Sequence, residues 1–196
     1  MGVLNLSDAS IKSGGKRTTF WDQATAWNEG LQLISTQSFS SVSTVEFDNV
    51  FSDKYVQYKV IGAVKTSGAD AGLHLRFRTG GSNNTSSIYN IQQYVGNGSS
   101  QGGVRYTSQT YWFEFLGIAK SSFEPVVITE LMNPYQTTYT SGLKMGGMNN
   151  ETASIQHDLR ALGTNATTSF DGFAIIPSAA VNLTGTISVY GYYKGE

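Results

Sequence analysis

The most regular feature of the chain is an alternation of apolar and polar residues with a period of two, which is typical of strands that bury one face. The clearest example is residues 72–80, GLHLRFRTG. In this segment three apolar side chains alternate with three polar ones, namely Leu73, Leu75 and Phe77 with His74, Arg76 and Arg78. The pattern predicts a strand with one apolar face and one cationic face.

Two further segments carry strong strand patterns. In residues 55–64, YVQYKVIGAV, the alternation predicts a half-buried strand. In residues 111–119, YWFEFLGIA, both faces carry apolar side chains, which fits the centre of a sheet or a subunit interface. Similar patterns predict strands at 40–47, 86–95, 102–108, 124–132 and 170–177.

Short connectors rich in Gly, Asn, Ser and Thr separate these strands, for example at 79–87, 96–103 and 162–169. Strands joined by such turns at regular short spacing predict an all-β, antiparallel β-sandwich of jelly-roll type. The 196 residues fit one such domain, spanning residues 1–196.

Two segments favour strands less clearly. In residues 19–30 apolar residues recur at helical spacing behind a capping box formed by Thr19 and Asp22, which predicts one short helix. In residues 152–163, TASIQHDLRALG, a helical face and a strand alternation fit equally well, so both readings stay open.

The chain ends on a strand-forming segment, residues 183–196, LTGTISVYGYYKGE. Ile187 and Val189 share one face, and Ser188, Tyr190 and Tyr192 share the other. The first face suits the core, and the tyrosine face is left for a sheet or subunit contact. Together with the aromatic segment at 111–119, it supplies the candidate interface residues, which are Tyr111, Trp112, Tyr190 and Tyr192.

Composition narrows the function classes. Net charge is −1 and the 13 Lys and Arg residues are scattered, which argues against a nucleic-acid partner or an anionic membrane surface. The chain has no cysteine, so disulfides and thiol chemistry are excluded. No signal peptide or spanning segment is evident, so the chain is expected to be made in the cytoplasm as a soluble protein.

Candidate chemistry is sparse. His157 and Asp158 could be assembled with a serine into a hydrolytic set, but no G-x-S-x-G motif supports it. Paired acids for glycoside hydrolysis could be drawn from Asp22, Glu29, Glu46, Asp48, Glu114 and Glu124, although the sequence gives no pairing. His74, Arg76 and Arg78 could form a cationic face for a carboxylate or phosphate. No spacing indicates a metal or cofactor site, so no enzyme activity is predicted.

Three segments together resemble a group of tailed-bacteriophage virion structural proteins. They are VEFDNVFSDKYVQYKV at 45–60, LHLRFRTGG…SIYNIQQY at 73–94 and FDGFAIIPSAAVNLTGTISVYGYYKG at 170–195. The shared motifs are an aromatic strand entry, a Leu-x-Leu-Arg strand and a closing Thr-Gly-x-Ile-Ser-Val-Tyr-Gly. The first comprises Phe47, Phe51, Tyr55 and Tyr58.

The resemblance implies a jelly-roll-like β-sandwich that assembles with copies of itself and with other virion proteins. It implies a non-enzymatic capsid decoration, cement or head-attached spike protein that resides in the virion, forms a homotrimer and docks on major capsid or tail proteins. The alternative is a tail-fibre, receptor-binding or carbohydrate-binding module, for which a host-surface glycan would be the partner. A jelly-roll glycosidase or lyase ranks last.

Overall fold

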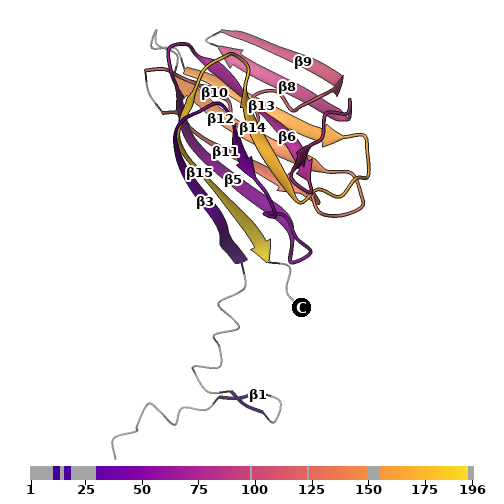
Figure 1. Cartoon of the computed structure of the whole chain (residues 1–196). Coiled ribbons are helices and arrows are strands. Elements are labelled where there is room, and N and C mark those ends of the chain that lie inside the picture. The colour runs from indigo at the N-terminus through magenta and orange to yellow at the C-terminus, as the bar shows by residue number, and fades with distance from the viewer. Residues whose placement is uncertain are drawn as a thin grey trace, which may run out of the picture.

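The computed structural model describes residues 11–13, 16–18, 30–97, 99–122, 124–149 and 155–193 (Figure 1). Every regular element in these ranges is a β-strand, and neighbouring strands run antiparallel. The strands are β1 Ile11–Ser13, β2 Lys16–Thr18, β3 Gly30–Val42, β4 Val45–Phe47, β5 Tyr55–Thr66, β6 Ala71–Thr79, β7 Ser82–Asn83, β8 Tyr89–Asn97, β9 Ser100–Gln109, β10 Ile118–Ala119, β11 Val126–Met132, β12 Ser141–Asn149, β13 Ile155–Thr164, β14 Gly172–Pro177 and β15 Leu183–Tyr193.

Two of the sheets pack face to face. The larger has eight strands in the order β3-β15-β5-β11-β12-β13-β8-β9, and the smaller has the order β10-β6-β14-β4, with β7 paired to β6. Strands β1 and β2 form a separate pair. The prediction of an all-β antiparallel β-sandwich is confirmed.

The strand order is that of a jelly roll. The eight framework strands, in chain order, are β3, β4, β5, β6, β10, β11, β14 and β15. Numbered one to eight, they follow the order 1-8-3-6 in the larger sheet and 2-7-4-5 in the smaller one. This is the double Greek-key arrangement in which the chain repeatedly crosses between two sheets.

Two insertions widen the larger sheet. β8 and β9 come from the connection between β6 and β10, and β12 and β13 from the connection between β11 and β14. The four strands pair in the order β12-β13-β8-β9 beyond β11, so that β8 and β9 lie at the opposite end of the sheet from β3 (Figure 1). This four-stranded extension is the main addition to the jelly-roll framework.

The core between the sheets is rich in aromatic rings. Phe77 lies at its centre, 4.4 Å from Phe170 and 4.9 Å from Trp112 between ring centroids. Trp112 is fully buried and donates from Nε1 to the Gly163 carbonyl, 3.0 Å away on the extension. The prediction that Trp112 is an interface residue is therefore wrong, because its ring is fully buried between the two sheets.

The strand expected at 111–119 is also largely wrong. Trp112 pairs with Leu75 through a single bridge, and the chain then turns, with positive φ at Glu114 (46°) and Gly117 (76°). Only β10 remains as a strand. The turn lets Trp112, Phe115 and Leu116 all reach the interior, which a regular strand with a period of two would prevent.

Three other segments refine the sequence prediction. Residues 152–163, for which both readings stayed open, contain β13, and the described part of this segment is extended. The helix expected at 19–30 lies outside the described residues except for Gly30, which begins β3. On β15 the alternation holds as predicted, because Ile187 and Val189 are fully buried.

Gly172 gives a direct test of how closely β4 and β14 pack. A Cβ at this position would lie 2.0 Å from the backbone oxygen of Phe47, whereas a Cβ at Gly163 would meet nothing within 4 Å. We expect Gly172→Ala to lower the free energy of unfolding by roughly 1–3 kcal/mol, because the backbones must separate. Gly163→Ala is the matched control and should change it by about 0.5 kcal/mol or less. Equal effects of both variants in urea denaturation would contradict the close approach of β4 and β14.

Candidate functional site

The surface that stands out is the side of the eight-stranded sheet that faces away from the smaller sheet. Its strands direct large apolar side chains outward with exposed fractions between 38% and 67%. We call this set the outer apolar face. It comprises Leu31 and Leu33 on β3, Val126, Ile128 and Met132 on β11, Leu143 and Met145 on β12, Leu159 on β13, and Tyr94 on β8.

The strand register brings four residues of this set, together with the half-buried Ile61 on β5, into one continuous row. Ile61, Ile128, Met145, Leu159 and Tyr94 lie directly opposite one another on five neighbouring strands. Directly opposed side chains on an antiparallel sheet lie within about 5.5 Å of each other at Cβ, so the row is uninterrupted. Monomeric proteins rarely leave an apolar patch of this extent uncovered.

Charged residues beside the row are paired with one another. Lys59 lies 3.3 Å from Glu130, and its ammonium group sits over the ring of Tyr192, 5.7 Å from the centroid. The Tyr192 hydroxyl and then the Glu130 carboxylate raise the pKa of Lys59, so the ammonium form persists. Further along β5, Lys65 and Glu124 lie 3.9 Å apart. These pairs leave the face between β5 and β11 without net charge.

Two of the four predicted interface residues lie on the same side of the sheet as the outer apolar face. Tyr190 and Tyr192 lie half-buried on the outer side of β15, opposite Lys59 and Gln57. Tyr111 is also half-buried but lies elsewhere, stacked on His74 of the smaller sheet at 4.5 Å. Sequence reasoning missed the larger contribution of β11 and β12. The alternation in 124–132 was the available signal, but both of its faces are apolar.

The predicted cationic ligand face on β6 is occupied by the protein itself. The Arg78 side chain is buried and lies 2.7 Å from Asp48 and 2.8 Å from Glu46. Arg76 donates from Nε to the Thr110 carbonyl at 3.2 Å, and its guanidinium lies over the Tyr111 ring. The contacts of Arg78 use the donors that a carboxylate or phosphate ligand would need, so the prediction of a ligand site that includes Arg78 is wrong.

His74, the third member of that face, is held in its neutral form. It is 7% exposed, and its Nδ1 accepts a hydrogen bond from the Glu114 backbone N–H at 3.0 Å. Burial, followed by the positive charges of Arg160 and Arg76, lowers the pKa of His74 to about 4. The imidazole therefore serves as an acceptor that fixes the 111–117 turn.

A buried ion cluster lies on the inner face of the extension. Lys144 and Asp158 are 2.6 Å apart, Arg160 lies 2.9 Å from Asp158, and Arg160 also bonds Glu114 on the turn. Burial and then the neighbouring Arg160 charge lower the pKa of Lys144. Burial acts to raise the pKa of Asp158, but the bonds from Arg160 and Lys144 outweigh it and lower that pKa. The cluster is internally neutral and fully paired.

The hydrolytic set considered from the sequence does not assemble. His157 is exposed on the outer side of β13, whereas Asp158 is buried on the inner side, because successive residues of a strand point to opposite faces. The candidate acids are also engaged. Glu46 and Asp48 pair with Arg78, Glu114 with Arg160 and Glu124 with Lys65, while Asp22 and Glu29 lie outside the described residues.

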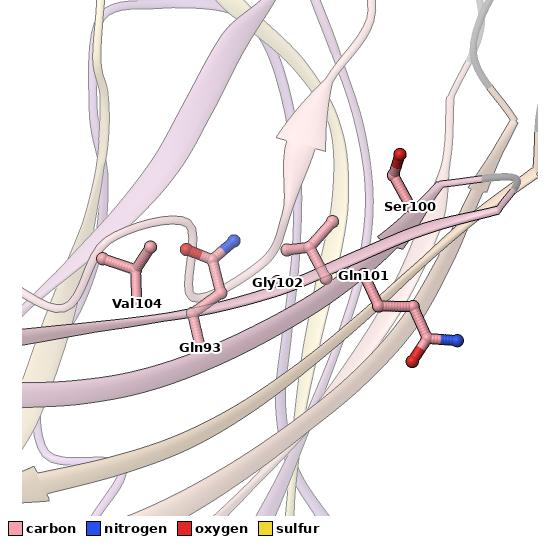
Figure 2. A pocket seen from close by; sticks show the side chains of 6 residues that line it. Gln93, Ser100, Gln101, Gly102 and Val104 are labelled. Atoms are coloured by element: carbon pink, nitrogen blue, oxygen red, sulfur yellow. The ribbon is translucent and has the colours of Figure 1, made fainter.

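A shallow hollow of about 420 Å³ lies on the β8–β9 hairpin (Figure 2). It is lined by Gln93, Val95, Ser100, Gln101, Gly102 and Val104. Gln93 and Val104 are directly opposed across the hairpin, and Tyr106, two residues along β9, packs its ring 5.0 Å from Phe113. The hollow thus combines the Gln93 side-chain amide with a neighbouring aromatic ring, whereas the Gln101 side chain points to the other side of the hairpin, where it accepts a hydrogen bond from Tyr94 (Figure 2).

Among the described residues, no group of three or more His, Asp and Glu side chains is arranged to hold a metal ion. No helix among those residues is long and apolar enough to cross a membrane. In comparisons with known proteins, no family model, no curated protein and no solved structure matches the chain.

His74 makes stability depend on pH in a defined window. The free imidazole takes up a proton near pH 6.5 and the folded one only near pH 4, so the unfolded state binds more protons between these values. Stability from this group is therefore complete above about pH 6.5 and falls as the pH is lowered. We expect a loss of about 2 kcal/mol in the free energy of unfolding between pH 7.5 and 5.

The measurement is urea denaturation at several pH values, with His74→Gln as the comparison. The variant keeps a side-chain acceptor but cannot titrate, so its stability should change much less over the same interval. A dependence of equal size in both proteins would assign the effect to another group.

Proposed function

We propose that this chain is a non-enzymatic structural component of a bacteriophage virion, a capsid decoration, cement or head-attached spike protein that works by assembling on the particle. The outer apolar face carries this proposal. A folded domain that leaves large side chains such as Val126 and Met145 more than 60% exposed on one flat sheet needs a protein partner to cover them.

The interior supports a mechanical role. Of the acids considered for catalysis, Glu46, Asp48, Glu114, Glu124 and Asp158 form ion pairs. The cluster of Lys144, Asp158 and Arg160 lies buried beneath the 111–117 turn. Groups committed to partners in this way rigidify a fold, because moving any one leaves a buried charge unpaired. Rigidity suits a protein that keeps its shape outside the cell.

The resemblance to phage virion proteins adds the second line of support. Its three segments contain all or part of the framework strands β4, β5, β6, β14 and β15, together with β7 and most of the inserted strand β8. The aromatic strand entry places Phe47, Phe51 and Tyr58 in the core, with Phe51 and Tyr58 in edge contact at 4.8 Å. The shared residues are therefore those that specify the sandwich.

Purified particles of a phage that encodes this chain provide the test. We expect mass spectrometry to find the chain in gradient-purified virions, and labelled antibodies to locate it on the head. Protein added to particles that lack it should bind and co-sediment. Val126→Glu should weaken that binding at least tenfold, because an added carboxylate would be buried against an apolar partner. Particles without the chain, or with no affinity for it, would contradict the proposal.

The hollow on β8 and β9 supports a second candidate function, carbohydrate recognition. Amide groups such as that of Gln93 can hydrogen-bond sugar hydroxyls, and an aromatic ring such as Tyr106 can stack on a sugar face. This face is separate from the outer apolar face, so the two functions are compatible.

A glycan array tests the second candidate. Binding of a glycan by the wild-type chain should weaken about five- to tenfold in Tyr106→Ala, since ring stacking contributes roughly 1 kcal/mol. Tyr139→Ala, which removes a 60% exposed tyrosine from a loop, is the control and should bind normally. Absence of binding across the array, or equal losses in both variants, would remove carbohydrate recognition.

A further inference from the structure

We propose that the outer apolar face is covered by a second copy of this chain, packed sheet against sheet. This inference rests on the proposed function, which treats the face as an assembly surface. It goes further because it names the molecule that covers the face. Three properties of the face support a copy over another virion protein: its chemistry, its charge and its area.

The chemistry is that of one half of a sandwich core. At the centre of the row, Ile128 is 43% exposed, Met145 67% and Leu159 41%, on three adjacent strands. Facing sheets in sandwiches pack about 10 Å apart with such side chains interdigitated. A copy of the chain would present the same residues, so each apolar side chain would meet another apolar side chain.

The charge pattern removes the usual obstacle to self-association. Identical faces that carry unpaired charges repel each other, which often costs several kcal/mol. Here Lys59 is paired with Glu130 and Lys65 with Glu124 within one chain. Arg105 on β9, at the edge strand of the sheet, is a further exposed charge on this side. A partner with a strongly charged surface would instead have to bury its charges against the apolar row without compensation. The electrostatics therefore favour a copy of the same face.

The area is sufficient for a stable contact. Eight strands spaced about 4.8 Å apart give a sheet roughly 35 Å wide, and the exposed apolar positions on β11 extend over roughly 20 Å along the strand. Full coverage would bury about 700 Å² on each copy. This approaches the roughly 800 Å² per partner found in standard stable interfaces.

Light scattering coupled to size-exclusion chromatography, and sedimentation over a range of concentrations, test the inference on the full chain. We expect the wild-type protein to be an oligomer at micromolar concentration. Met145→Glu should weaken self-association at least 100-fold, because two copies would bury carboxylates against each other's apolar face. Val104→Glu is the matched control. Val104 is 48% exposed on the opposite side of the same sheet, and its substitution should leave the oligomer intact.

A second measurement does not depend on disrupting the oligomer. The chain has no cysteine, so single substitutions introduce one defined crosslinking position. Met145→Cys and Ile128→Cys should crosslink between chains with a short thiol-reactive linker, and Val104→Cys should not. A wild-type monomer at 100 µM, an oligomer that Met145→Glu leaves intact, or crosslinking confined to Val104→Cys would overturn the inference.

The outcome is separable from that of the proposed function. A monomeric chain that still binds phage particles through Met145 would overturn the self-contact and leave the virion role standing. An oligomer formed through this face by a chain absent from purified particles would support the self-contact and overturn the virion role.

Discussion

The width of the larger sheet is the constraint on which the rest of the structure depends. Its eight strands extend beyond the smaller sheet, which ends at β10. The smaller sheet does not cover the inner side of the four-stranded extension. The 111–117 turn covers this side instead and so keeps the core from solvent. Trp112 fills the gap and bonds the Gly163 carbonyl, while Glu114 on the turn bonds Arg160. The turn is thus fixed by both packing and charge.

This closure also explains the buried ions. Lys144, Asp158 and Arg160 lie where the two sheets separate, and each is at least 97% buried. Ion pairs in such places contribute less to stability than their geometry suggests, because desolvation offsets the attraction. Removing one partner is nevertheless costly, since a charge is then left buried alone. The cluster therefore holds one arrangement of the turn and disfavours others.

The two faces of the four-stranded extension are covered to different degrees. The inner side is covered by the turn near β13 and opens toward β9, where the shallow hollow lies. The outer side carries a row of apolar side chains that the described part of the chain does not cover. The larger sheet packs one face into its own core and exposes apolar side chains on the other, as the middle layer of a larger assembly would. Assembly would complete it, which links the fold to the proposed role.

The sequence by itself determined the all-β class, many of the turns and the apolar side of strands such as β5, β6 and β15, because a period of two depends only on local geometry. It also placed Tyr190 and Tyr192 on one face of the last strand, and Ile187 and Val189 on the other face. It did not predict β12 or residues 31–39 of β3 as strands. Tertiary structure decided which face is covered and by what. A period of two would place Trp112 and Phe115 on opposite faces, yet both fill the core, because the chain turns at Glu114. The outer row also depends on the pairing of β11 with β5 and of β13 with β8, which are distant in sequence and which local patterns do not specify.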